Sequence, residues 1–100
     1  MLALTEFALS HTVALAEEMD QPESDVSMGR IARTKAQATL SAREVTRLAR
    51  ECLGGNGILM EHRVMKHLLD AEVMYTGEGT YDVNSLVSGR DITGGLSAFL

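Results

Sequence analysis

The chain has 100 residues, of which 45% are hydrophobic and 23% charged, and its formal net charge is -5. This length allows one domain at most, so a complete enzyme with two cofactor-binding domains is excluded. The nine Lys and Arg residues are spread along the chain, which argues against nucleic acid as a partner because phosphate binding needs clustered positive charge.

No run of about 18 apolar residues predicts a membrane-spanning helix. The N-terminus has neither the basic region nor the small-residue cleavage site of a signal peptide. We therefore expect no membrane insertion, and a location in the cytoplasm or, if the source is eukaryotic, in an organelle matrix.

The first predicted helix runs from Leu2 to about Met19. Apolar residues recur there at intervals of about four, which is the pattern of one buried helix face. The expected face consists of Leu4, Ala8, Leu9, Val13 and Ala16. Pro22 follows shortly after and limits the helix, because proline cannot continue one.

The second predicted helix begins at Ser24 or Asp25, which are both favourable N-cap residues, and runs to about Leu53. Its expected apolar stripe consists of Ile31, Ala38, Ala42, Val45, Ala49 and Leu53. The basic residues between positions 30 and 50 fall at helical intervals among Glu and Ser, which predicts a solvated face. The loop Gly54-Gly55-Asn56-Gly57 ends the helix, since glycine readily adopts left-handed conformations.

Two further helices are predicted, from about Met60 to Tyr75 and from about Thr80 to Asp91. Their expected buried faces consist of Val64, Leu68, Ala71 and Met74 in the third helix and Val83, Leu86 and Val87 in the fourth. The aromatic content of 4% disfavours sheet. The predicted fold class is therefore all-α, an up-and-down antiparallel bundle of about four helices.

Two glycine-rich loops are the first candidates for function. Gly54-Gly55-Asn56-Gly57 either only stops a helix or lets its backbone approach a phosphate or a ring. It is too short for a dinucleotide fingerprint, and no strand precedes it. In Gly77-Glu78-Gly79-Thr80, a carboxylate is flanked by two glycines. Glu78 is either a solvated turn residue or a general base for proton abstraction next to a carbonyl.

The remaining reactive residues are weaker candidates. His62 and His67 are five residues apart and lack the spacing of a zinc helix, so we assign no metal site. We expect Cys52 to be a buried small hydrophobe, and His11 to be exposed or packed at an edge. Lys66 and Asp70 are expected to form an ion pair on a helix face.

The stretch from Ala49 to Phe99 resembles the C-terminal end of acyl-CoA dehydrogenases. That family carries a GGxG loop, a helix and a YEGT loop at about this spacing, and then a helix ending in Gly-Arg or Ala-Arg. The matching elements here are Gly54-Gly55-Asn56-Gly57, Gly77-Glu78-Gly79-Thr80, Gly89-Arg90 and Ile92-Thr93-Gly94. The resemblance is strongest to the branch that contains glutaryl-CoA dehydrogenase and the short-chain acyl-CoA oxidases. Residues 1–48 fit by helix length and pattern only.

The resemblance implies a flavin-dependent enzyme that converts an acyl-CoA thioester to the 2,3-enoyl-CoA, with FAD accepting the β-hydride. Glu78 would be the catalytic base, and Gly79 would contact the thioester. The residues implied near FAD are Thr80, Tyr81 and Asp82, together with Glu51, Gly54 and Gly55, which would approach the FAD of an adjacent subunit. The family also implies a homo-oligomer, a dimer or tetramer.

The chain departs from the family at several positions and in the domains that it lacks. His62 stands where an aromatic residue is common, and Glu51 where many relatives have Gln. Gly77 stands where the family usually has Tyr, which removes an aromatic wall and loosens the backbone. Nothing here resembles the family's β domain or N-terminal helices, so we expect residues 1–100 to be a C-terminal bundle that is inactive alone. Two alternatives stay open: a non-catalytic helical oligomerisation module, and an unrelated bundle in which Glu78 points into open water.

Overall fold

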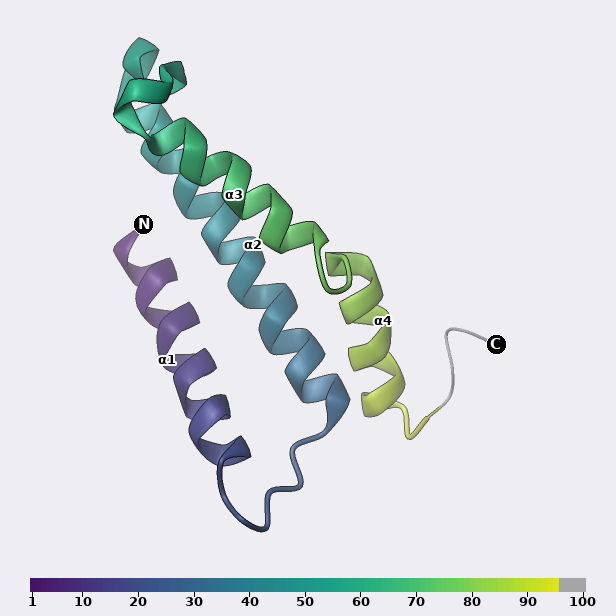
Figure 1. Ribbon diagram of the computed structural model, residues 1–100. Coiled ribbons are helices and arrows are strands. Elements are labelled where there is room, and N and C mark those ends of the chain that lie inside the picture. The colour runs from purple at the N-terminus through teal and green to yellow at the C-terminus, as the bar shows by residue number, and fades with distance from the viewer. Residues whose placement is uncertain (96–100) are drawn as a thin grey trace.

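The chain folds into four α-helices and two short 3-10 helices in a computed structural model that describes residues 1–95 (Figure 1). The α-helices are α1 (Leu2–Met19), α2 (Met28–Cys52), α3 (Val64–Thr76) and α4 (Tyr81–Ile92), and the 3-10 helices are η1 (Gly54–Ile58) and η2 (Met60–His62). The described residues contain no strand, which confirms the all-α fold class. Residues 96–100, which include the end of the stretch that carries the family resemblance, lie outside the described residues.

The long helix α2 is the centre of the fold. α1 packs along one side of it, and α3 and α4 pack along the other. α3 and α4 follow one another in the same direction, antiparallel to α2, with a sharp bend between them (Figure 1). The bundle therefore has three antiparallel rods, and the third rod is bent at residues 77–80.

The start of α2 differs from the sequence prediction. Ser24 and Asp25 lie before the helix, and the N-cap is Ser27, whose hydroxyl accepts a hydrogen bond from the backbone N–H of Arg30. The Ser27 hydroxyl also donates to Asp91 Oδ2 at 2.9 Å. A contact with the end of α4 therefore selects this serine over two equally suitable residues upstream.

The ends of α2 and α3 follow local backbone chemistry. α2 ends at Cys52, and Gly54 just after it has a φ of 57°, the left-handed conformation expected for a helix stop. The predicted start of α3 at Met60 is wrong. Met60–His62 form a 3-10 turn, and Arg63 has a φ of 63° that separates this turn from α3.

The hydrophobic core is small, and every predicted face contains exposed residues, including Leu53 at the end of the second and Met74 in the third. Its buried apolar residues are Leu15, Ala32, Ala36 and Ala71. In α1 the face toward α2 includes Leu15, whereas Leu9 and Val13 are exposed. In α4 the buried positions are Asn84 and Ser88, while Val83 and Leu86 are exposed. Both buried polar side chains form hydrogen bonds, which removes the usual penalty for burying them.

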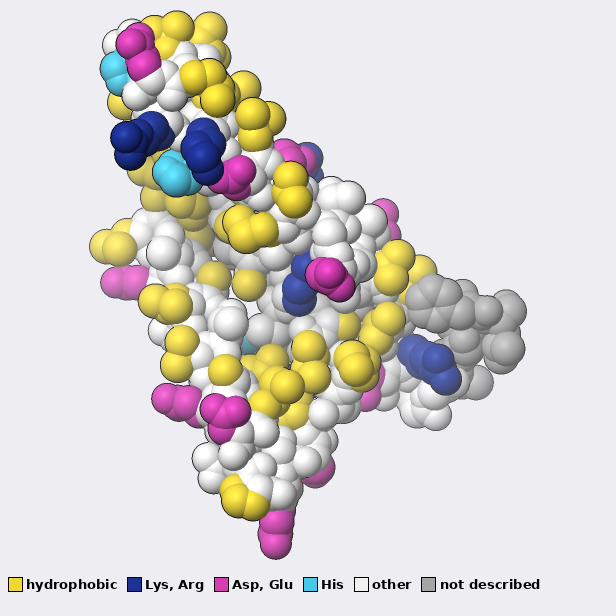
Figure 2. Space-filling view, viewed as in Figure 1, with side chains coloured by type: hydrophobic (Ala, Val, Ile, Leu, Met, Phe, Trp, Pro, Cys, Tyr) yellow, Lys and Arg dark blue, Asp and Glu magenta, His cyan; other side chains and the backbone are white. Residues whose placement is uncertain are grey.

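Much of the apolar surface is uncovered. The chain exposes 6922 Å², against about 5,500 Å² for a compact chain of this mass. The radius of gyration is 16.1 Å, against about 13 Å for a compact domain of 100 residues. Apolar side chains form several groups on the face shown in Figure 2, and Leu2, Phe7, Val73 and Ile92 are each at least 70% exposed. A surface of this kind is typical of a segment that packs against other protein.

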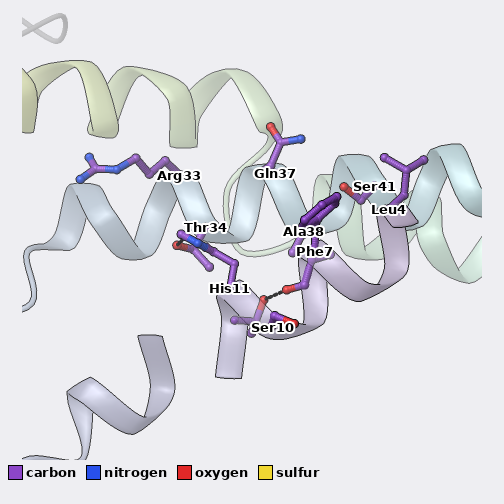
Figure 3. Close-up of a pocket in the computed structure, with 11 residues that line it drawn as sticks. Leu4, Phe7, Ser10, His11, Arg33, Thr34, Gln37, Ala38 and Ser41 are labelled. Carbon is purple, nitrogen blue, oxygen red and sulfur yellow. Dashed lines mark hydrogen bonds between the residues drawn. The ribbon is translucent and has the colours of Figure 1, made fainter. Parts of the chain in front are cut away.

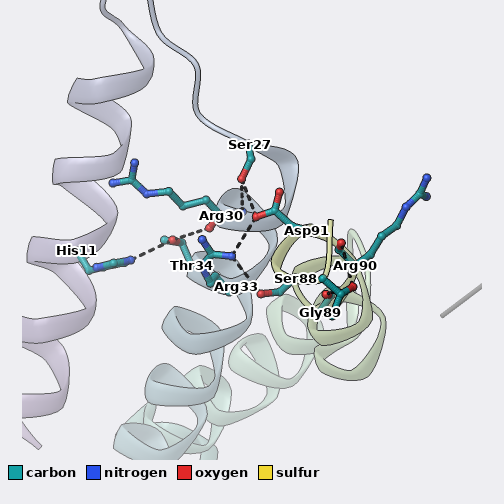
Figure 4. Close-up of polar contacts among 10 residues, drawn as sticks. His11, Ser27, Arg30, Arg33, Thr34, Ser88, Gly89, Arg90 and Asp91 are labelled. Atoms are coloured by element: carbon teal, nitrogen blue, oxygen red, sulfur yellow. Dashed lines mark hydrogen bonds and ion pairs between the residues drawn. The ribbon is translucent and has the colours of Figure 1, made fainter. Parts of the chain in front are cut away.

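Polar contacts hold the outer helices to α2 (Figure 4). His11 on α1 is exposed and lies with its Nε2 3.1 Å from the hydroxyl of Thr34, as expected for an edge-packed histidine. Arg33 donates to Ser88 and to Asp91 on α4, at 3.3 Å in each case. The predicted Lys66–Asp70 ion pair within α3 is also confirmed.

We expect acid to loosen α1. Arg30 Nη1 on α2 donates to Glu18 Oε1 on α1 at 2.6 Å, and this hydrogen bond lowers the pKa of Glu18 below its ordinary value of 4.5. A lowered folded pKa means that the bond stabilises the docked helix above about 4.5 and is lost as the pH falls through the lowered value. Protection of the α1 amides from hydrogen exchange, relative to the unfolded chain at the same pH, should be lower at about pH 3 than at about pH 6. In Glu18→Gln this difference in protection should be smaller. Equal pH dependence in both proteins would contradict it.

Candidate active-site loop

The loop Gly77–Thr80 lies at the bend between α3 and α4. Gly77 is the C-cap of α3, with an extended ψ of 154°. Glu78 then has a φ of 55°, and Gly79 has a φ of 91°. Two successive left-handed residues produce the bend, and the first of them is not a glycine. A left-handed conformation costs an L-residue with a Cβ about 1–2 kcal/mol.

The Glu78 side chain is exposed and unpaired. Within residues 1–95 it makes no hydrogen bond or ion pair. Gly79 beside it is half-buried, and a Cβ built there would lie 3.0 Å from Asn84 Nδ2. A side chain at position 79 would therefore meet both backbone strain and crowding, which explains the second glycine without reference to a ligand.

Side chains from α2 and α4 fix the backbone around Glu78. Lys35 Nζ donates to the carbonyl oxygen of Gly79 at 2.6 Å and, over a longer 3.4 Å, to that of Tyr75. Asn84 Nδ2 donates to the carbonyl oxygens of Gly79 and Thr80, at 2.8 and 3.1 Å. The Tyr75 carbonyl, which lies in the last turn of α3 and has no partner within the helix, thereby gains a donor. The Thr80 carbonyl also accepts from the Asn84 backbone N–H at 2.9 Å.

The three predicted cofactor-contact residues after Glu78 form the start of α4. The Thr80 hydroxyl caps the helix by accepting a hydrogen bond from the Val83 backbone N–H at 3.2 Å. The Tyr81 ring stacks on that of Tyr75, with ring centroids 5.7 Å apart. Asp82 is exposed in the first turn, where a negative charge favours the helix dipole. Thr80 and Tyr81 thus already have partners within the chain.

The aromatic stack continues to α2. The Arg43 guanidinium lies 4.6 Å from the centroid of the Tyr75 ring, a cation–π geometry. Arg43 Nε also donates to Glu72 on α3, and this hydrogen bond raises the pKa of Arg43. The bend is therefore bounded on its α3 side by a packed row of charged and aromatic groups.

In the second loop, Gly54–Gly57, the fold requires two of the three glycines. Gly54 needs its left-handed conformation, and a Cβ on Gly57 would lie 2.2 Å from the carbonyl oxygen of Arg50. At Gly55 a Cβ would meet nothing within 4 Å, and the backbone is not left-handed. The fold therefore explains Gly54 and Gly57 but gives no reason for a glycine at position 55.

Two other predictions concern the end of α2. Glu51 is exposed and pairs with Arg47 one turn earlier. Cys52 is exposed, so its assignment as a buried hydrophobe is wrong. It lies at the last turn of α2, where α1 no longer runs alongside in Figure 1 and the following glycines supply no side chains to cover it.

The structure does not bring the eight candidate residues together. Lys35, which contacts the Glu78 loop, and Glu51 on the same helix are separated by about 24 Å of helix axis, at about 1.5 Å per residue. Glu78, Gly79 and residues 80–82 thus form one group, and Glu51, Gly54 and Gly55 form another. Within one chain the two groups are therefore separate and do not line a common site.

An open groove of about 800 Å³ lies between α1 and α2 (Figure 3). Its walls include Phe7 and His11 from α1, and Gln37 and Ala38 from α2. None of the eight candidate residues lines it, so it is separate from the Glu78 loop.

The fold and the loop define a helical bundle domain with an accessible carboxylate at a fixed bend. Residues 1–93 match the family model described as "Acyl-CoA dehydrogenase, C-terminal domain". The chain therefore belongs to the acyl-CoA dehydrogenase family, which excludes an unrelated bundle. Among the described residues, no helix combines the length and apolar character needed to cross a membrane.

Sequence reasoning missed Lys35 and Asn84. Lys35 lies within the group of basic residues assigned to a solvated face, and helical periodicity alone cannot tell which of them meets a loop. Asn84 lies in a stretch where apolar neighbours were expected to face the core. The available signal was its position four residues after Thr80, which is one turn from the loop and within reach of its carbonyls.

Proposed function

We propose that this chain is the C-terminal part of a flavin-dependent acyl-CoA dehydrogenase that oxidises an acyl-CoA thioester to the 2,3-enoyl-CoA, with Glu78 as the base. The family match over residues 1–93 is the observation that carries the proposal. Residues 1–100 then act as the C-terminal helical bundle of a longer enzyme. Within that family we propose the branch that contains glutaryl-CoA dehydrogenase and the short-chain acyl-CoA oxidases, on the sequence resemblance of the stretch from Ala49 to Phe99.

The geometry at the bend suits Glu78 to proton abstraction. A base must come within hydrogen-bond reach of the proton that it removes. The Glu78 carboxylate is exposed, has no partner among the described residues, and extends from a backbone that is anchored on both sides. Gly79 beside it presents no side chain to the thioester. The carboxylate is thus free to accept the α-proton without first breaking an ion pair.

FAD, when bound, accepts the β-hydride, which no protein side chain can do. Thr80, Tyr81 and Asp82 lie next to Glu78 and would contact the flavin that serves the same active site. Glu51, Gly54 and Gly55 would contact the flavin of a neighbouring copy, which accounts for their distance from Glu78. Gly55 supports this assignment, since the fold itself does not require a glycine there.

A second function has one observation in its favour. The large exposed apolar surface suits a non-catalytic oligomerisation module that has kept the family fold. This alternative predicts a stable dimer or tetramer that binds no flavin. It also predicts that Glu78 can be replaced without consequence.

A flavin absorbance spectrum separates the two functions. We expect the chain, when combined with domains that hold FAD, to show the perturbed absorbance spectrum of a bound flavin. Adding glutaryl-CoA or butyryl-CoA without oxygen should then bleach the flavin absorbance. The chain alone with added FAD should show no bleaching. Gly55→Val should lower flavin occupancy while leaving the helical circular dichroism unchanged. A stable oligomer with no flavin in any combination would instead favour the module.

A further inference from the structure

Lys35 makes an unusual connection for a surface lysine. The chain has two lysines, and Lys66 pairs with Asp70 within its own helix. Lys35 is half-buried, and its ammonium leaves α2 to reach the carbonyls of Gly79 and Tyr75 on either side of Glu78. The Lys35 side chain thus contacts the backbone on both sides of the residue proposed as the base. One contacted carbonyl precedes Glu78 in the chain and the other follows it.

Glu78 adopts a backbone conformation that other contacts must stabilise. Glu78 has a φ of 55°, which is sterically unfavourable for a residue with a Cβ. Such conformations persist where the surrounding structure imposes them, and they concentrate at functional sites. The groups that hold the loop are Lys35, Asn84 and the Thr80 cap, of which only Lys35 is charged. Hydrogen bonds from a charged donor are the stronger kind.

Other contacts also hold these helices together. α2 is joined to α4 by Arg33 with Asp91 and to α3 by Arg43 with Glu72, and helix packing adds to both. Lys35 itself donates only to backbone carbonyls at the bend among the described residues, so we expect its effect to be local. We propose that Lys35 is a positioning residue that acts through the loop backbone to hold the Glu78 carboxylate in place for proton abstraction. This inference rests on the proposed function of Glu78.

Proteolysis at Glu78 tests the positioning without any enzyme activity. A Glu-specific protease cleaves the Glu78–Gly79 bond only when the loop opens, so the cleavage rate follows the open population. We expect Lys35→Met to raise this rate roughly tenfold, with cleavage after the exposed Glu23 unchanged. Lys66→Met is the matched control and should change neither rate. Lys35→Arg, which keeps a charged donor, should reverse much of the effect.

A second measurement uses the unaltered chain, in case Lys35→Met does not fold. Because there are only two lysines, NMR of the lysine side-chain ammonium groups gives two signals, and Lys66→Met identifies them. We expect the Lys35 signal to show slowed proton exchange and a coupling across the hydrogen bond to the Gly79 carbonyl. A freely exchanging Lys35 ammonium overturns the proposal, as does equal cleavage at Glu78 in Lys35→Met and Lys66→Met.

The catalytic consequence is tested separately in the flavin-loaded assembly. We expect Lys35→Met to lower kcat while KM for the acyl-CoA stays nearly constant, because the change displaces the base and not the bound substrate. A loosened loop with unchanged kcat overturns the positioning function. If Glu78→Gln also keeps full activity, the proposed base is wrong, and that outcome is distinct from a failure of Lys35 alone.

Discussion

Gly57→Ala should destabilise the domain by about 2–3 kcal/mol, a large effect for the addition of one methyl group. The new Cβ would lie 2.2 Å from the Arg50 carbonyl oxygen and 3.0 Å from its carbonyl carbon. Both atoms belong to the backbone of the last turns of α2, so relief requires a shift of η1 away from α2. Urea denaturation followed by circular dichroism measures the change.

Gly55→Ala is the matched control in the same loop. A Cβ there meets nothing within 4 Å, so we expect the free energy of unfolding to change by less than about 0.5 kcal/mol. Equal destabilisation by both substitutions would mean that the loop is constrained by overall glycine content and not by contact with Arg50. A large difference between the two free energies of unfolding would show that the fold requires Gly57 and does not require Gly55.

The sequence predicted the helices better than their buried faces. The four helices and the glycine stops followed from local chemistry, since proline, glycine and capping residues act within a few positions. The faces depended on which neighbours each helix meets. α2 is contacted from more than one side, so its buried positions are small residues around its circumference, such as Ala32, Ala36 and Ser41. No single apolar stripe predicts that arrangement.

The candidate residues were predictable to the extent that they lie in a recognisable motif. Glu78 and its loop followed from the family resemblance, but its left-handed backbone and its anchors did not. Lys35 is more than forty positions away in the chain, and only the packing of α2 against the bend brings it there. The position of Ser27 as the cap of α2 likewise depends on Asp91 at the far end of the sequence.

In the flavin-loaded assembly, Glu78→Gln should lower kcat by about 10²–10⁴-fold, the range that a positioned general base contributes. Glutamine keeps the length and shape of the side chain, so the bend and its hydrogen bonds to Lys35 and Asn84 should stay intact. The amide cannot accept the α-proton as a carboxylate does. Exchange of the α-hydrogens of butyryl-CoA with D₂O, followed by mass spectrometry, reports the proton step directly.

The control is Glu23→Gln, an exposed glutamate in the connection between α1 and α2, which should keep both kcat and exchange. The flavin spectrum should be the same in both variants, because Glu78 is proposed to bind a proton and not the cofactor. Retained exchange in Glu78→Gln would assign the base to another residue. Loss of exchange in Glu78→Gln, with exchange retained in Glu23→Gln, would support Glu78 as the residue that accepts the α-proton.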